Sequence, residues 1–301
     1  MDPPPRRRLS KAMNVWDSCG SACIAFFAQN PNGISLMFLT VAYQATSGAA
    51  AFTDQDMTLV SDPSVTNLNN HPIFPVPVWI QWAYVLGLTT TRARISAPRL
   101  RPITRPVVQP VDSSATPSEA YRLVEYFRHP VALNPVEEIQ FLVTKTSAVA
   151  ETDVAVLTVG DSQRNVPQGD MYTLRCTTAY TPTVGSWTSG ALTADDTLQV
   201  GRYSIIGLRV NSLAAVAARL IFPGAPIMGG LPQIRPGVIA TQSNATEGYW
   251  QFRYGVMGEF GQFESFALPQ VEVLVPTGQV AAANPEVFLD IVPVRVGARA
   301  Q

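Results

Sequence analysis

The pattern of apolar and polar residues along the chain favours β-strands over helices. Short apolar runs, such as residues 139–144, 154–159, 271–275 and 287–292, are separated by clusters of turn-forming residues. The 25 prolines and 20 glycines interrupt the rest of the chain, so few windows can hold a helix of ten residues. This pattern predicts an all-β protein, built as a sandwich or barrel with few short helices.

Three segments add detail to this prediction. Residues 23–28 and 34–41 flank the turn sequence Asn30-Pro31-Asn32-Gly33, which predicts a hairpin. Both arms are almost continuously apolar, so we expect protein to cover both of their faces. Helices are expected only at residues 118–127 and at the alanine-rich residues 213–220.

An internal repeat is the most informative feature, because residues 82–160 can be laid on residues 203–296 in one order. The matched stretches are Val85-Leu86-Gly87 with Ile205-Ile206-Gly207, Ala97, Arg99 and Leu100 with Ala217, Arg219 and Leu220, Glu119 with Glu247, Val136-Glu137 with Val271-Glu272, and Asp153-Val154 with Glu286-Val287. Similar composition alone would explain isolated matches of valine and proline. The collinear series predicts a duplicated module of the size of an eight-stranded jelly roll. We therefore expect a first module at 13–165 and a second at 166–301.

Charge is scarce and unevenly placed. Hydrophobic residues make up 47% of the chain, charged residues only 14%, and the net charge is −1. A surface so poor in charge is typical of a protein covered by neighbours, and it provides no global field for nucleic acid. The one dense basic cluster is Arg6, Arg7, Arg8 and Lys11, in a proline-rich arm at residues 1–12. Such an arm can contact nucleic-acid phosphates or anionic lipids, or can simply improve solubility.

Cysteine usage and hydropathy bear on where the protein is made. Cys19, Cys23 and Cys176 are odd in number, which argues against a disulfide framework and favours buried thiols in a reducing compartment. Cys19 and Cys23 have the spacing of half a metal site, but no second pair follows them. No apolar run is long enough to span a membrane, and no signal peptide is recognisable. Synthesis in a cytoplasm is expected.

Residues that could carry chemistry are few. The two histidines, His71 and His129, both precede proline and are expected to be structural or surface residues. The pairs Asp54 with Asp56 and Asp195 with Asp196 could bind a calcium ion, but solvated turns are the simpler interpretation. Because no nucleophile, phosphate-loop or metalloprotease motif occurs, we predict neither an enzyme nor a bound cofactor or metal.

Two jelly-roll-sized modules in tandem, a short basic arm and a low charge resemble the double-jelly-roll major capsid proteins of tailless icosahedral viruses, including tectivirus, corticovirus and finnlake-type phages. The resemblance implies a protein of the virion, made in the host cytoplasm, that forms trimers of pseudo-hexagonal outline and tiles an icosahedral shell. Its partners would be further copies of itself and other virion proteins. The arm with Arg6, Arg7, Arg8 and Lys11 would point inward, to a membrane or the genome.

Two other functions remain open. A tandem β-sandwich that binds or processes carbohydrate would use exposed aromatic residues, for which Trp187, Tyr249 and Trp250 are the candidates. A minor capsid or spike protein would share the fold and differ in copy number. In the capsid interpretation, residues 61–77 and 223–231 are long insertions that would decorate the outside.

Overall fold

The computed structural model describes residues 38–47, 52–62, 65–75, 77–87, 90–100, 107–108, 110–111, 125–146, 151–160, 169–212, 215–222, 233–234 and 261–294. All of them belong to one compact unit that begins at Leu36. The predicted basic arm, the turn near Asn32 and the first arm of the predicted hairpin lie outside the described residues.

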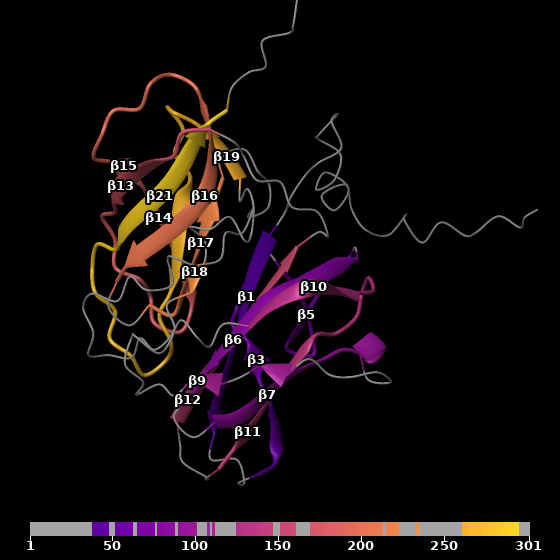
Figure 1. Ribbon diagram of the computed structural model, residues 1–301. Coiled ribbons are helices and arrows are strands. Elements are labelled where there is room, and N and C mark those ends of the chain that lie inside the picture. The colour runs from indigo at the N-terminus through magenta and orange to yellow at the C-terminus, as the bar shows by residue number, and fades with distance from the viewer. Residues whose placement is uncertain are drawn as a thin grey trace, which may run out of the picture. The chain divides into compact units, whose positions relative to one another are not determined.

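The first group of strands forms two main sheets, drawn in indigo to magenta in Figure 1. Its elements are β1 (Phe38–Ser47), β2 (Asp54–Asp56), β3 (Thr58–Leu59), β4 (Thr66–Leu68), β5 (His71–Ile73), β6 (Val78–Leu86), β7 (Thr90–Ser96), the 3₁₀-helix η3 (Pro98–Leu100), β8 (Val107–Val108), β9 (Pro110–Val111), β10 (Glu125–Leu133), β11 (Gln140–Lys145) and β12 (Glu151–Gly160). One sheet has the order β10-β6-β12-β1-β3, with β9 also pairing to β6, and the other has the order β2-β11-β7-β8. We call this pair of sheets the first sandwich.

The second group, drawn in magenta to yellow, also forms two sheets (Figure 1). Its elements are β13 (Tyr172–Thr177), β14 (Trp187–Ala191), β15 (Thr193–Ala194), β16 (Arg202–Asn211), β17 (Ala217–Ile221), β18 (Gln233–Ile234), β19 (Gly261–Glu264), β20 (Gln270–Leu274) and β21 (Glu286–Pro293). The sheets have the orders β15-β13-β21-β16-β19 and β14-β20-β17-β18. We call this pair the second sandwich.

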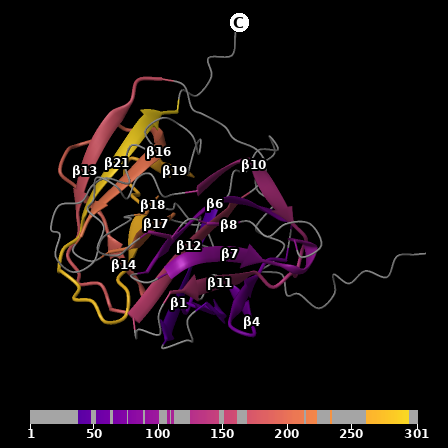
Figure 2. The same ribbon diagram turned by 60° about the horizontal axis from the view of Figure 1, so that its bottom comes forward.

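Both sandwiches have the strand order of a jelly roll. In the first, β1-β12-β6-β10 face β2-β11-β7-β8, and in the second, β13-β21-β16-β19 face β14-β20-β17-β18. Numbered along the chain, each set runs 1-8-3-6 and 2-7-4-5, and an extra short strand, β3 or β15, pairs with strand 1 in each. Figure 2 shows the paired strands β7 and β11 from a second direction. The all-β jelly-roll prediction is confirmed, and the predicted strands at 139–144, 154–159, 271–275 and 287–292 match β11, β12, β20 and β21.

The residue pairing predicted from the repeat is wrong in two places. Arg99 lies in η3, after β7, whereas its predicted partner Arg219 lies within β17. Glu137 precedes β11, whereas Glu272 lies within β20. Short β-rich segments have similar compositions, so two of them can be aligned about equally well at several offsets. Strand order is what the two sandwiches share, while gene duplication and the boundary at 165/166 stay predictions.

Both predicted helices are wrong where the structure describes them. Residues 217–221 form strand β17, and residues 125–127 begin strand β10. In β17, Ala217 and Ala218 are buried between β18 and β20, where a small side chain suits the close packing. Packing in a sheet thus overrides the helical propensity of alanine.

Strand β1 shows why its sequence is continuously apolar. Leu39, Val41 and Tyr43 belong to the core of the first sandwich. Ala42, which points to the opposite face, packs in a cluster with residues of the second sandwich. The prediction that both faces are covered is therefore confirmed for the part of 34–41 that the structure describes.

Candidate functional site

A buried charge cluster is centred on Arg219, in the middle of β17. Arg219 lies directly opposite Glu272 of β20, so the two side chains emerge on the same face of their sheet. Ala217 and Leu274, which also pair, lie on that face, and so does Trp187, which pairs with Leu274 from the other side. This face therefore carries one cation and one carboxylate among apolar neighbours.

The guanidinium of Arg219 forms four hydrogen bonds, three of them to the first sandwich. Its Nη1 and Nη2 donate to Asp62 Oδ2 and Oδ1 at 2.5 and 3.1 Å, and Nη1 also donates to the Thr40 carbonyl oxygen at 2.9 Å. Its Nε donates to Glu272 Oε2 at 2.5 Å. The Arg219 and Asp62 side chains are 0% exposed. A bidentate arginine–carboxylate contact, or fork, of this kind combines charge-assisted hydrogen bonds with a fixed geometry.

Trp187 completes the surroundings of the cation. The Arg219 guanidinium carbon lies 4.2 Å from the centroid of the Trp187 ring, within the range of a cation–π contact. The indole thus shields from water the side of the guanidinium that it covers.

The cluster holds more negative than positive charge when both acids are ionised. Burial raises the pKa of Glu272, an effect that the charge of Asp62 reinforces and that Arg219 opposes. Burial together with the nearby Glu272 charge also raises the pKa of Tyr180. Low polarity around the cluster makes a second buried carboxylate costly, because Arg219 is shared between the two acids in the ion pairs that the structure describes.

Apolar residues surround the charges and make one continuous contact between the sandwiches. Ala42, Val60, Leu86, Val154 and Val156 of the first sandwich share a buried cluster with the second. A hydrogen bond from the Thr277 hydroxyl to Gln44 Oε1, at 2.9 Å, lies at the exposed margin. Burial of this apolar surface stabilises the packing of the two sandwiches against each other. The Arg219–Asp62 fork forms only when the two sandwiches pack in one relative position.

A second buried ion pair lies within the first sandwich. Lys145 Nζ is 2.7 Å from Asp153 Oδ2, with side chains 1% and 0% exposed. Asp153 Oδ1 accepts a hydrogen bond from the Thr90 hydroxyl at 2.9 Å. This pair ties β11 of one sheet to β12 of the other sheet of the first sandwich.

The predicted histidine positions have different outcomes. His71 is buried in β5, and its Nε2 lies 2.9 Å from Asp56 Oδ2, which makes it a structural residue. His129 belongs to β10, and its side chain lies outside the described residues.

Neither acidic pair forms a cation site with a third ligand. Asp54 pairs with Arg94 and accepts from the Thr144 hydroxyl, while Asp56 pairs with His71. Asp195 pairs with Arg175, and Asp196 lines a surface hollow. Within the described residues no group of three or more histidine, cysteine, aspartate or glutamate side chains could hold a metal ion.

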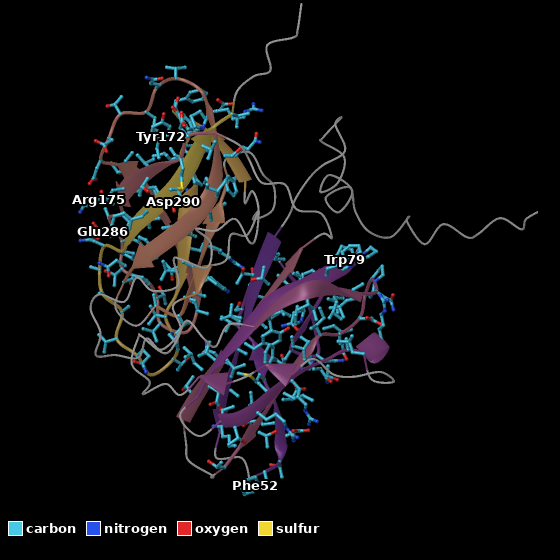
Figure 3. The ribbon with its side chains drawn as sticks, viewed as in Figure 1. Phe52, Trp79, Tyr172, Arg175, Glu286 and Asp290 are labelled. Atoms are coloured by element: carbon cyan, nitrogen blue, oxygen red, sulfur yellow. The ribbon has the colours of Figure 1, made fainter. Side chains whose placement is uncertain are left out.

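Arg175 forms an exposed charge network across neighbouring strands. It pairs with Asp195 beside β15 and with Glu286 of β21, and Figure 3 shows Arg175 and Glu286 together at the outer edge of the second sandwich. The partner carboxylates raise the pKa of Arg175 further. On the next residue, burial followed by the charge of Asp195 raises the pKa of the Cys176 thiol to about 12, which agrees with a buried, unreactive cysteine.

The predicted aromatic platform for sugars does not form at Trp187. Its side chain is 9% exposed and covers Arg219, so it has no free face for a ligand. Tyr249 and Trp250 lie outside the described residues, as do Arg6, Arg7, Arg8, Lys11, Cys19, Cys23, Glu119, Glu247 and residues 223–231. Of the insertion at 61–77, the described part holds the β4–β5 hairpin, whose turn residues Asn69 and Asn70 have φ of 51° and 65°.

Sequence reasoning missed the Arg219 cluster. Asp62 is 157 residues from Arg219 along the chain, and no spacing rule connects them. The available signal was an arginine inside the apolar run 217–221 and a glutamate inside 271–275, since a charge in a buried strand needs a partner.

Comparisons with known proteins give little support from sequence. No family model matches the chain, and no curated protein matches it. A comparison with solved structures found the major capsid protein P2 of bacteriophage PM2, with 10% identity, a TM-score of 0.20, and coverage of 87% of this chain and 100% of that one. A score this low carries no argument about fold or function, so the proposal below is based on topology and contacts. No described helix has the length and hydropathy of a membrane span.

Proposed function

We propose that this chain is a viral major capsid protein that assembles into an icosahedral shell as trimers of pseudo-hexagonal outline. The observation that carries the proposal is the pair of jelly-roll sandwiches with the same strand order in one chain. Jelly rolls are common in capsid and lectin domains, because two packed sheets give a rigid block with loops at both ends.

The contact between the sandwiches supports a structural role. A shell subunit must keep a fixed shape while its flanks bind other copies. The Arg219–Asp62 fork and the apolar residues around it provide such rigidity, since sliding one sandwich over the other would leave a buried charge without its partner.

Composition supports the same role. Only 14% of the residues are charged, and large apolar side chains such as Phe52, Tyr172 and Val200 are exposed. Exposed apolar residues on a block of this kind are suited to burial against further copies. In this proposal the arm with Arg6, Arg7, Arg8 and Lys11 faces inward, toward a membrane or the genome.

Light scattering and negative-stain electron microscopy of the purified protein test the proposal. Trimers with a hexagonal outline, or closed shells, would support it, whereas a monomer at high concentration would refute it. Counting the copies per particle would separate a major capsid protein from a minor or spike protein.

A further inference from the structure

We propose that Phe52 of one copy inserts into a hollow beside Tyr172 of a second copy, so that the two sandwiches supply opposite halves of a subunit contact. The inference rests on the proposed function and names a contact by which the copies would associate.

Phe52 has two unusual properties that together point to a binding role. Its side chain is 73% exposed, and its backbone has φ of 62°, in the left-handed region that bulky residues rarely occupy. The strained turn is fixed by a hydrogen bond of 2.8 Å from the Phe52 amide to the Lys145 carbonyl oxygen. Figure 3 shows Phe52 at one end of the first sandwich. Strain retained at an exposed aromatic residue, where packing does not require it, suggests a functional constraint.

The second sandwich has a hollow that suits an aromatic ring. The hollow has a volume of about 300 Å³, its apolar lining includes Tyr172, Leu174, Tyr203 and Ile291, and Asp196 and Thr197 are among its polar lining residues. Tyr172 is itself 53% exposed and labelled in Figure 3. An aromatic side chain seated in a mainly apolar hollow is the typical centre of a protein–protein contact.

Charges beside the two features are complementary. Arg92 is half exposed and lies on the strand next to the Phe52 turn, since it pairs with Thr144 of β11. Arg92 lies 3.7 Å from Asp54, which also pairs with Arg94, so among the described ion pairs two arginines share one carboxylate at this end of the sandwich. The hollow carries the acid Asp196. An arginine beside the inserted ring and a carboxylate beside the hollow would favour one orientation of the two copies.

The occupant we propose is a second copy, because the inserting residue and the hollow occur on the same chain. The two surfaces differ, so the contact is heterologous, and it generates a ring when the rotation between successive copies closes. A ring of this kind agrees with the trimer in the proposed function.

The test measures self-association of the full-length protein by light scattering over a range of concentrations. Phe52→Ser should weaken association by about thirtyfold, the loss typical of an aromatic residue at the centre of a contact. Phe266→Ser is the matched control, because Phe266 is 82% exposed on another loop and should leave association unchanged. Unchanged unfolding curves would show that both variants fold.

A charge exchange and a cross-link test the specificity of the contact. Arg92→Glu should weaken association, and Arg92→Glu combined with Asp196→Arg should restore it. In Phe52→Cys with Thr197→Cys, oxidation should link the two positions between chains, as mass spectrometry of the linked peptides would show.

The outcomes separate the inference from the proposed function. If the wild-type protein does not associate at all, the capsid proposal fails and the contact with it. If the wild type associates and Phe52→Ser associates equally well, or if no link forms between positions 52 and 197, the contact is refuted while the capsid proposal stands.

Discussion

The two sandwiches share a strand order but use buried charge differently. The first joins its two sheets with a buried ion pair, Lys145 and Asp153. The second directs Arg219 out of its own sheet, toward Asp62 and the Thr40 carbonyl of the first. One ion pair therefore serves a single sandwich, whereas the other makes two sandwiches into one block.

This comparison predicts that Arg219 is the most sensitive position in the block. Arg219→Met should lower the free energy of unfolding by about 3–5 kcal/mol, because two carboxylates would remain buried without a cation. Denaturant unfolding measures the loss. Arg202→Met is the control, since the Arg202–Glu264 pair is exposed and should matter by less than about 1 kcal/mol. Equal losses for the two variants would contradict the role given to the cluster.

Lys145 should matter somewhat less. Lys145→Met leaves only one carboxylate, Asp153, which still accepts the Thr90 hydrogen bond. We expect a loss of about 3 kcal/mol in the free energy of unfolding, at the lower end of the range for a broken buried pair. The two-sandwich comparison predicts a further difference: limited proteolysis of Arg219→Met should release one sandwich from the other, whereas Lys145→Met should open the first sandwich itself. The same fragments from both variants would argue against this distinction.

Two glycines matched by the sequence repeat provide a comparison at equivalent strands. A methyl group on Gly87 would collide with Asp153 and Thr90, and one on Gly207 would collide with Asp290. Both aspartates are fully buried, so neither has room to move away. Gly87→Ala and Gly207→Ala should each cost about 1–3 kcal/mol in unfolding free energy, as expected for overpacking. Gly201→Ala is the control, because no atom lies within 4 Å of the added carbon.

The match of the two glycines also shows which features of the fold could be predicted from the sequence. Strand positions, the fold class and the similarity of the β6 and β16 regions followed from apolar runs and turn residues, which are local signals. The matches of Arg99 with Arg219 and Glu137 with Glu272 failed, because alignment of short β-segments does not determine register. The alanine-rich residues 213–220 predicted a helix, since nothing local reveals that two strands enclose Ala217 and Ala218.

The charge cluster lay beyond sequence reasoning for a different reason. Arg219 and Asp62 come into contact only when both sandwiches have folded and packed together. The sequence around one of these residues therefore gives no indication of the other. The signal in the sequence was limited to charges placed within apolar runs, which indicate that a partner exists but not which residue it is.

The smallest expected effect is on the pH dependence of the free energy of unfolding, and it arises from Glu272 in the Arg219 cluster. Burial raises the pKa of Glu272, with Asp62 adding to the effect and Arg219 opposing it. The folded state then binds a proton more tightly than the unfolded state, so this group's contribution to stability is full in acid and is lost as the pH rises through the folded pKa.

Glu272→Gln keeps a hydrogen-bond acceptor for Arg219 Nε but cannot take up a proton. We expect its free energy of unfolding at pH 7 to lie within about 1 kcal/mol of the wild type, since the lost ionic contact and the removed surplus charge offset each other. As the pH falls through the raised folded pKa toward the ordinary carboxyl pKa, the wild type should gain stability relative to the variant, with a difference in slope of at most about 1.4 kcal/mol per pH unit. Glu264→Gln, which alters an exposed carboxylate paired with Arg202, should show no such difference. Parallel curves for the wild type and Glu272→Gln would mean that Glu272 stays ionised in the cluster, and that the Arg219 guanidinium compensates both carboxylates despite their burial.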